Sequence, residues 1–382
     1  MQKKPRILRR LAKRALVSAN VVVVAWLLLC LAASYTSPRE VKYLALCSLT
    51  IPFALLFNAG FAVFWLFTTR RLFSLFSIGA LLACYQLVLV VFGWNLAGRN
   101  DWKPAEDRVK VMSWNVHGLG LFNKPLNKED KKNIARVIKD EDADILCLPE
   151  YSLMRDGSTE KYTLQLAKEN GYKAYKFNTD NTYGYHVILG TQLFSRYPLS
   201  NYTSYDLGNM IYLVQADVQL PRNKTMRMFF IHLYSFGLSD NDRNYIEQVR
   251  NNNTEIKSDL GVSRTFIGKF NRSWAIRAGQ ADSIAAIVSK SPYPVLLCGD
   301  FNDLPGSYTY TKIRGNLNDA FCDKGVGIGR TYNQIFPTLR IDNILYDSRA
   351  LEALAYRSYY THMSDHNPVI ANFRILEPVE QE

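Results

Sequence analysis

Three long apolar stretches without a charged residue occupy most of the first hundred positions of this 382-residue chain. They cover about residues 15–33, 43–67 and 72–94, and each is near or above the roughly 20 residues that a helix needs to cross a bilayer. Tyr35, Tyr43, Trp65 and Trp94 lie towards their ends, as interfacial aromatic residues do. We therefore predict that residues 1–96 form a membrane anchor of three transmembrane helices, with the lipid bilayer as a partner.

The basic residues around these stretches predict the orientation in the membrane. Seven Lys or Arg precede the first stretch, and the pair Arg70-Arg71 lies between the second and the third. The positive-inside rule then places the N-terminus in the cytoplasm, and three crossings place the rest of the chain outside it. In a Gram-negative cell, this integral inner-membrane protein would face the periplasm. Alternatively, the first stretch is a cleaved signal peptide with small residues near positions 32–34, which leaves the rest of the chain outside as well.

The formal net charge of +12 is concentrated in this N-terminal region. Residues 1–100 hold twelve Lys or Arg and one acid, a net charge of +11, so the other 282 residues carry only +1. A protein that grips many phosphates of a nucleic acid is expected to have a basic face. The composition therefore gives no support for nucleic acid as the main partner.

The remaining chain has the pattern of one α/β domain over residues 108–376, joined to the anchor by a polar linker at residues 97–107. An amphipathic pattern predicts helices, among them residues 277–288. A strand, a helix and a strand at the start of the domain predict a right-handed crossover. Strands are predicted at about residues 109–115, 144–148, 185–194, 211–220, 227–233, 295–298, 341–346 and 369–375.

A polar or titratable residue follows many of these apolar runs. Taken singly, each has a simple explanation, because Asp and Asn are common in turns and a lone His is often a satisfied core residue. The recurrence is harder to explain in this way, since open α/β sheets bind their ligands at strand ends. The set comprises Asn115, Glu150, His232, Asp300, Asn302, Asp342, Asp365 and His366.

The chemistry of this set predicts a divalent cation. It offers oxygen and imidazole ligands and no Cys, which favours Mg²⁺ (or Mn²⁺) over zinc. Such an ion neutralises charge on a phosphate while a base activates water. A histidine oriented by a carboxylate is a competent general acid or base near neutral pH.

Six short motifs resemble, in their order, those of the endonuclease/exonuclease/phosphatase (DNase-I-like) superfamily over about residues 107–376. The chain also resembles bacterial members that attach this domain to several membrane helices. The resemblance implies a four-layered α/β sandwich of two packed mixed sheets flanked by helices. The motifs are Trp114-Asn-Val-His117, Leu148-Pro-Glu150, Ile231-His-Leu233, Gly299-Asp-Phe-Asn302, Arg340-Ile-Asp-Asn-Ile344 and Ser364-Asp-His366.

The same resemblance implies roles for the residues of the set. Glu150 would be the principal metal ligand, with Asn115 and Asp365 nearby. Asp300 and Asn302 would position the attacking water and the phosphate. Asp342 would orient His366, and His232 would contact the phosphate or protonate the leaving oxygen. Which histidine is base and which is acid, and how many metal ions take part, stay open.

The chain departs from the family pattern in two places. Asn343 stands where the family often has Tyr or another large residue, and residues 235–273 form a long connection. Because such segments select the substrate in this superfamily, specificity is not implied by the resemblance.

Three functions follow from these observations. The favoured one is a membrane-anchored, metal-dependent hydrolase that cleaves a phosphodiester, in a lipid or a small molecule, outside the cytoplasm. The alternative is an extracytoplasmic endonuclease or exonuclease, which the missing charge excess disfavours. A catalytically inactive binding protein of the same fold is the third, and the intact set of residues argues against it.

Overall fold

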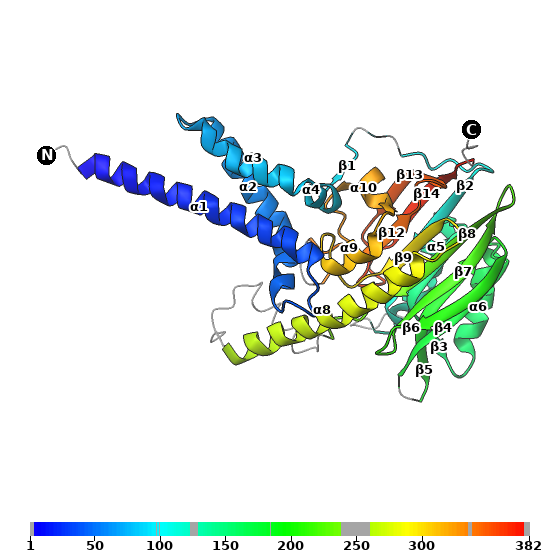
Figure 1. The fold of residues 1–382 in the computed structure, drawn as a ribbon. Helices are drawn as coiled ribbons and strands as arrows, with labels where there is room; N and C mark the ends of the chain where they lie inside the picture. The colour runs from blue at the N-terminus through cyan, green and yellow to red at the C-terminus, as the bar shows by residue number, and fades with distance from the viewer. Residues whose placement is uncertain are drawn as a thin grey trace.

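The computed structural model describes residues 4–377 except 97, 99, 123–128, 184, 238–259 and 335–337 (Figure 1). Its helices are α1 (Lys4–Tyr35), α2 (Ile51–Leu66), α3 (Ser74–Ala83), α4 (Tyr85–Val91), α5 (Asp130–Glu141), α6 (Ser158–Glu169), α8 (Leu260–Val288), α9 (Tyr308–Arg314) and α10 (Ala320–Lys324), with 3₁₀ turns η1 (Leu44–Thr50), η2 (Arg71–Phe73) and η3 (His117–Gly120). Its strands are β1 (Gly93–Trp94), β2 (Arg108–Ser113), β3 (Ile145–Met154), β4 (Ala174–Tyr183), β5 (Val187–Ser195), β6 (Leu199–Asp206), β7 (Tyr212–Leu220), β8 (Lys224–His232), β9 (Val295–Asp300), β10 (Asn318–Asp319), β11 (Val326–Gly327), β12 (Asp342–Tyr346), β13 (Leu351–Ser358) and β14 (Val369–Ile375).

Two six-stranded sheets form the centre of the domain. Their strand orders are β10-β12-β9-β8-β7-β6 and β13-β14-β2-β3-β5-β4. Both sheets are mixed, because β8 pairs with β9 and β2 pairs with β3 in parallel, while their other neighbours run antiparallel. The parallel pair β2–β3 encloses α5, as the predicted crossover requires.

The two sheets pack face to face, and the alternation of residues along their strands decides which side chains meet. Val109 and Val111 of one sheet share a buried cluster with Met228 and Phe230 of the other. The sequence of a strand that is covered on both faces is a continuous run of apolar residues. In β9, accordingly, Leu296 and Cys298 face the other sheet while Leu297 packs on the helical side.

Helices cover the outer face of each sheet and complete four layers. The sheet that contains β2 and β3 carries α5 and α6, whose Ile134, Ile138 and Leu166 pack with Trp114, directly after β2. The sheet that contains β8 and β9 carries α8 and α9, with Ile284 and other apolar residues packed against it. The predicted four-layered α/β sandwich is therefore confirmed (Figure 1).

The prediction of three continuous transmembrane helices is wrong for the third stretch. Two helices are long and apolar enough to cross a membrane, at Arg10–Tyr35 and Leu44–Leu66. The third stretch is a bent pair, Arg71–Ala83 and Tyr85–Val91, with an angle of 64° between its parts, and it makes a third crossing only if both parts form one span.

The bend has a physical cause that hydropathy does not reveal. Cys84, at the break, is fully buried, and Leu87, Val90 and Val91 of α4 belong to the same apolar cluster as Phe301 of the α/β domain. The apolar residues of α4 are thus buried against protein. This contact removes their apolar surface from water as effectively as lipid would.

The apolar N-terminal helices and the α/β domain pack directly on each other. A Cβ added to Gly306 would lie 2.9 Å from Ile51 Cδ1 and 2.9 Å from Leu87 Cδ2, so the helices approach the backbone closely there. Arg340 Nη2 donates a hydrogen bond of 2.7 Å to the carbonyl of Val90. In addition, β1 pairs with β11, which joins the residues just after α4 to the domain.

Residues 100–107, part of the predicted linker, also contact the domain. The backbone N–H of Asp101 donates to the carbonyl of Leu354, and Asn372 Nδ2 donates to the carbonyl of Asp101. The aromatic ring of Trp102 is faced by Arg357 at 4.5 Å from its centroid. This segment therefore lies along β13 and β14.

Candidate active site

Three neighbouring strands bring three of the predicted residues to one edge of a sheet. His232 ends β8, Asp300 ends β9 and Asp342 begins β12. The pairing register places His232 opposite Asp300 and Asp342 opposite Asp300. Strand β8 pairs with β9 in parallel, and β12 pairs with β9 in antiparallel orientation. Three residues that are far apart in the sequence therefore lie next to each other.

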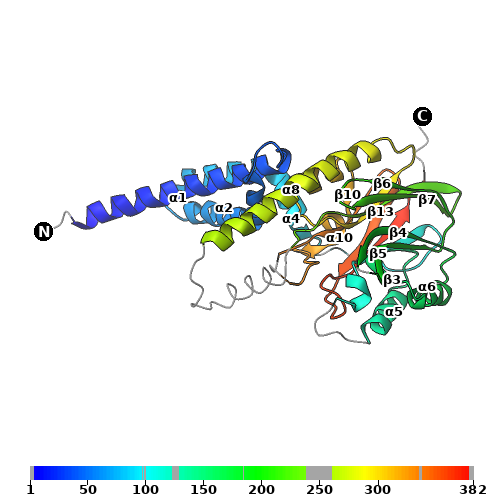
Figure 2. The ribbon, with the colours of Figure 1, turned by 90° about the horizontal axis from the view of Figure 1, so that it is seen from below.

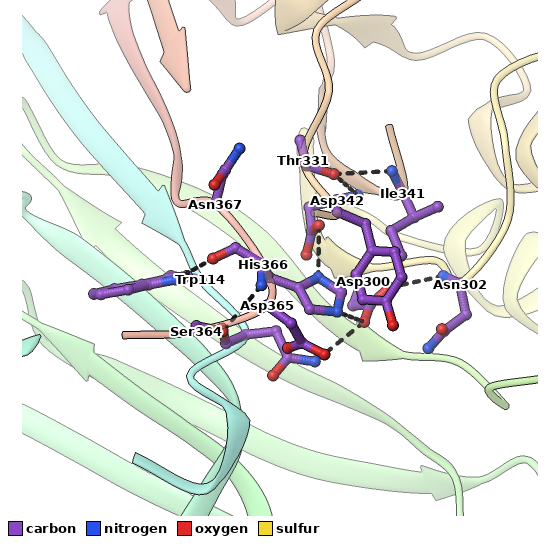
Figure 3. Close-up of polar contacts among 12 residues, drawn as sticks. Trp114, Asp300, Asn302, Thr331, Ile341, Asp342, Ser364, Asp365, His366 and Asn367 are labelled. Atoms are coloured by element: carbon purple, nitrogen blue, oxygen red, sulfur yellow. Dashed lines mark hydrogen bonds and ion pairs between the residues drawn. The ribbon is translucent and has the colours of Figure 1, made fainter. Parts of the chain in front are cut away.

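His366 lies between two carboxylates of this cluster (Figure 3). Its Nδ1 is 2.9 Å from Asp342 Oδ2, and its Nε2 is 3.7 Å from Asp300 Oδ2. Its backbone is fixed from both sides, because Ser364 Oγ accepts from the His366 N–H and Trp114 Nε1 donates to the His366 carbonyl. This geometry is compatible with the prediction that Asp342 orients the imidazole of His366.

Burial and charge act in opposite directions on this group. Burial lowers the pKa of His366, but the carboxylates of Asp342 and Asp300 outweigh it and raise that pKa well above its ordinary value. Burial also raises the pKa of Asp342, to about 6, against the opposing effect of His366. Asp342 Oδ1 is buried without a hydrogen-bond partner among the described residues, so this oxygen retains an open acceptor site.

A second part of the site forms around Glu150. Its φ of 51° and a register shift between β3 and β5 at residues 148–151 mark a bulge that turns this side chain out of the strand. Asn115 Nδ2 donates to Glu150 Oε1 at 3.1 Å and to Asp300 Oδ2 at 3.2 Å. His232 Nε2 lies 3.4 Å from Glu150 Oε1 and 3.9 Å from Asp300 Oδ2. Asn115 and His232 therefore join Glu150 to the Asp300 cluster.

The turn after β9 holds Asn302 in place. Gly299 has a φ of 140°, and a Cβ there would lie 1.9 Å from the carbonyl oxygen of Ile231, so a side chain is excluded. Asn302 itself has a φ of 49°; its backbone N–H donates to Asp300 Oδ1, and its Nδ2 donates to the carbonyl of Leu233. Asn302 is thus fixed next to Asp300 on the strand end.

Asp365 lines the same pocket and, as the chain neighbour of His366, also contributes to raising the pKa of that imidazole. Its Oδ1 is 2.8 Å from Nδ1 of His117, a histidine for which the sequence indicated no role. His117 has a φ of 44° and belongs to η3, directly after the Asn115 turn.

One pocket is lined by five of the predicted residues: Glu150, Asp300, Asn302, Asp365 and His366. Its polar part contains the acids Glu150, Asp300, Asp303 and Asp365, and no Lys or Arg is among its described lining residues. Asp303 is compensated by Arg277 of α8, whose Nε lies 3.3 Å away. The other three acids surround a space that a phosphate, itself an anion, would enter.

This charge balance is the test of whether a divalent cation fits. Bringing an anion next to several carboxylates is unfavourable unless a cation compensates it. The donors are hard oxygens and imidazoles, which suit Mg²⁺ or Mn²⁺. One ligand atom each of Asp300, Asp342 and His366 lies within 4.8 Å of the others, so acidic and imidazole groups are closely gathered at this end of the pocket. The residues present therefore fit a divalent cation.

Two further residues that sequence reasoning missed support the site. Thr331 is fully buried, and its Oγ1 accepts from the backbone N–H groups of Ile341 and Asp342, which fixes the start of β12. Asp180 of β4 has a pKa raised to about 6 by burial, and it interacts electrostatically with His232 and Glu150. Neither follows an apolar run, so the strand-end pattern could not find them.

The sandwich and the strand-end acids and histidines define a class of phosphoester-cleaving folds, and the comparisons identify the family. Residues 112–366 match the Endonuclease/Exonuclease/phosphatase family, and the chain therefore belongs to it. Members of this family are phosphoesterases and nucleases, generally dependent on divalent metals, which supports the prediction of a hydrolase acting on phosphoric esters. Residues 13–91 match a domain of unknown function, DUF8431. Among curated proteins, none matches the chain significantly.

Several solved structures share the fold at low sequence identity. An endonuclease/exonuclease/phosphatase from Beutenbergia cavernae DSM 12333 is 18% identical with a TM-score of 0.50, covering 70% of this chain and 72% of that chain. The human Nocturnin catalytic domain with bound sulfate anion is 16% identical with a TM-score of 0.51, covering 72% and 98%. ANGEL2, a 2',3'-cyclic phosphatase, is 15% identical with a TM-score of 0.50, covering 73% and 99%. At these identities the likeness shows the fold alone.

Proposed function

We propose that the protein is a membrane-anchored, Mg²⁺-dependent phosphoesterase that hydrolyses a phosphodiester outside the cytoplasm. The observation that carries this proposal is one pocket lined by Glu150, Asp300 and His366 and by no described Lys or Arg. His232 and Asp342 are not among its lining residues but contact them, His232 next to Glu150 and Asp342 next to His366. An acidic pocket of this kind attracts a cation, and the bound cation would in turn attract an anionic ester.

Glu150, Asn115 and Asp365 would hold the cation. When bound, it would neutralise charge on the phosphate and polarise the phosphorus–oxygen bond. Asn115 keeps Glu150 and Asp300 in fixed relative positions, since its amide donates to both carboxylates. Asn302, on the same turn as Asp300, supplies an amide side chain at the edge of the pocket.

The remaining residues would handle the protons. Asp300 faces both imidazoles, so its carboxylate is placed to bind the attacking water and accept a proton from it. His366 is kept protonated by its two carboxylate neighbours, so its Nε2 can donate to the phosphate or to the leaving oxygen. His232, next to Glu150, is the second candidate donor for the leaving oxygen.

The arrangement of the anchor supports the extracytoplasmic location. Figure 1 shows the N-terminal end of α1 and the turn between α2 and α3 at the end of the anchor away from the sheets. Both carry basic residues, including Arg10 and Arg14 in α1 and Arg70-Arg71 in the turn. The positive-inside rule assigns that end to the cytoplasm and the domain to the other side.

The test uses the full chain in detergent micelles. Bis-p-nitrophenyl phosphate, phospholipid mixed micelles and plasmid DNA are offered with and without Mg²⁺. We expect Mg²⁺-dependent diester hydrolysis that Glu150→Gln and His366→Ala each reduce by more than about 100-fold. The matched controls are Glu160→Gln, in α6, and His362→Ala, an exposed histidine four residues before His366. No metal-dependent turnover of any substrate would refute the proposal, and plasmid cleavage much faster than diester hydrolysis would make the protein a nuclease.

A further inference from the structure

One side of the catalytic pocket is an apolar wall. It lines the same pocket as the acids described above and consists of residues from five separate parts of the chain. Leu49 comes from η1, Phe236 follows β8, Phe270 belongs to α8, and Leu304 and Leu339 lie on loops next to β9 and β12. A small polar diester has no apolar part that could bind to such a surface.

The membrane anchor builds part of this wall together with α8. Ala45 of η1 and Leu46 and Leu49 pack in one cluster with Phe236, Phe270 and Trp274. The ring centroids of Phe236 and Phe270 are 4.3 Å apart. A backbone contact fixes the same junction, because the N–H of Tyr43 donates to Asn271 Oδ1. The wall is thus a packed structural feature.

The wall is continuous with the candidate membrane-spanning segment. Leu49 lines the pocket and at the same time lies inside the candidate span Leu44–Leu66. Figures 1 and 2 show α8 extending from the domain towards the side on which α1 and α2 lie. Phe270 of α8 packs there with Ala45 and Leu49 of η1. A route from the hydrocarbon of a bilayer to the acids therefore runs along apolar residues.

We propose that the substrate is a membrane lipid whose phosphate reaches the acids while the first carbons of its apolar part lie on this wall; this inference rests on the proposed function. An apolar pocket wall of buried and half-buried residues beside a group of acids matches an amphiphile at its polar–apolar boundary. Nucleic acid would place charged phosphates along that wall, where the described lining offers no basic residue.

The experiment compares two forms of one headgroup. Phosphatidylethanolamine, phosphatidylglycerol and sphingomyelin with long chains are presented in dodecyl maltoside micelles to the full-length protein with Mg²⁺. Water-soluble analogues carry the same headgroups on short chains, and bis-p-nitrophenyl phosphate reports in parallel on the catalytic groups. We expect kcat/KM for at least one long-chain lipid to exceed that of its short-chain analogue by about tenfold or more, from several methylenes moved out of water.

Variants of Leu49 assign that preference to the wall. We expect Leu49→Gln to lower the long-chain to short-chain ratio about fivefold to tenfold and Leu49→Met to keep it, since Met retains the apolar volume. Leu44→Gln, on the same 3₁₀ turn but outside the pocket lining, is the matched control. Equal kcat/KM for both chain lengths, or a ratio that Leu49→Gln leaves unchanged, would overturn this inference alone. A lack of any metal-dependent turnover, bis-p-nitrophenyl phosphate included, would instead overturn the proposed function and this inference with it.

Discussion

Replacing Asp342 by Asn removes one charge from the buried group around His366 and keeps its shape. Asp342 is 0% and His366 5% exposed, and the two are joined at 2.9 Å. Breaking a buried ion pair on one side costs about 3–5 kcal/mol. If the imidazolium acts in the transition state, this cost corresponds to a loss of about 150-fold to 5000-fold in kcat/KM, at about 1.4 kcal/mol per factor of ten.

The pKa of His366 provides a second and independent readout. In the wild type the carboxylates of Asp342 and Asp300 outweigh the effect of burial and raise the pKa of His366 well above its ordinary value. A group with a raised folded pKa contributes its stability below the unfolded pKa and loses it as the pH rises through the folded value. Asp342→Asn removes the hydrogen-bonded carboxylate and leaves burial opposed by Asp300 and, more weakly, Asp365, so the alkaline limb of kcat/KM moves to lower pH.

The assay is the pH profile of bis-p-nitrophenyl phosphate hydrolysis by the full-length protein at saturating Mg²⁺. Asp323→Asn, an acid outside the pocket that accepts from Tyr346 OH, serves as the control. A rate loss in Asp342→Asn with an unmoved alkaline limb would refute the assignment of His366 as the group that the carboxylates keep protonated. A kcat/KM of Asp342→Asn within a factor of about three of the wild-type value would show that catalysis does not require the Asp342–His366 ion pair.

Three further outcomes test other parts of the structure. Glu150→Gln should weaken Mg²⁺ binding by more than about tenfold in titration calorimetry, and an unchanged affinity would remove Glu150 from the metal site. Arg340→Met leaves Asp319, which is 1% exposed, without its partner at 2.7 Å, so denaturant unfolding should show about 3–5 kcal/mol less stability, whereas a wild-type midpoint would count against the pair. Gly299→Ala places a Cβ 1.9 Å from the oxygen of Ile231 at a φ of 140°, and it should cost at least about 1–3 kcal/mol; unaltered thermal melting would show that the turn relaxes freely.

Strand ends were the part of the site that sequence reasoning could locate. Asp300 and Asp342 each adjoin an apolar run, and such runs are visible without a structure. That they face each other follows from β12 pairing with β9, a long-range contact that no local pattern encodes. The convergence was therefore inferred from a family resemblance and from the behaviour of open sheets, and the register in the structure supplies its geometry.

Hydropathy does not distinguish an apolar residue that faces lipid from one that is buried against protein. It predicted α3 and α4 as one membrane helix, although Leu87 and Val90 are buried against the catalytic domain. For the same reason it gave Leu49 no role in the pocket. The predicted helix at residues 277–288 was also too short, because α8 begins at Leu260, beyond the segment with a clear amphipathic period.

The close packing of the anchor on the domain changes what a truncated protein would be. A fragment beginning at Asn100 would lose Ile51 and Leu87, which lie against Gly306. It would also lose the carbonyl of Val90 that Arg340 binds. Such a fragment would present a bare apolar face to water, so its aggregation or inactivity would report a missing part of the fold and carry no information about catalysis.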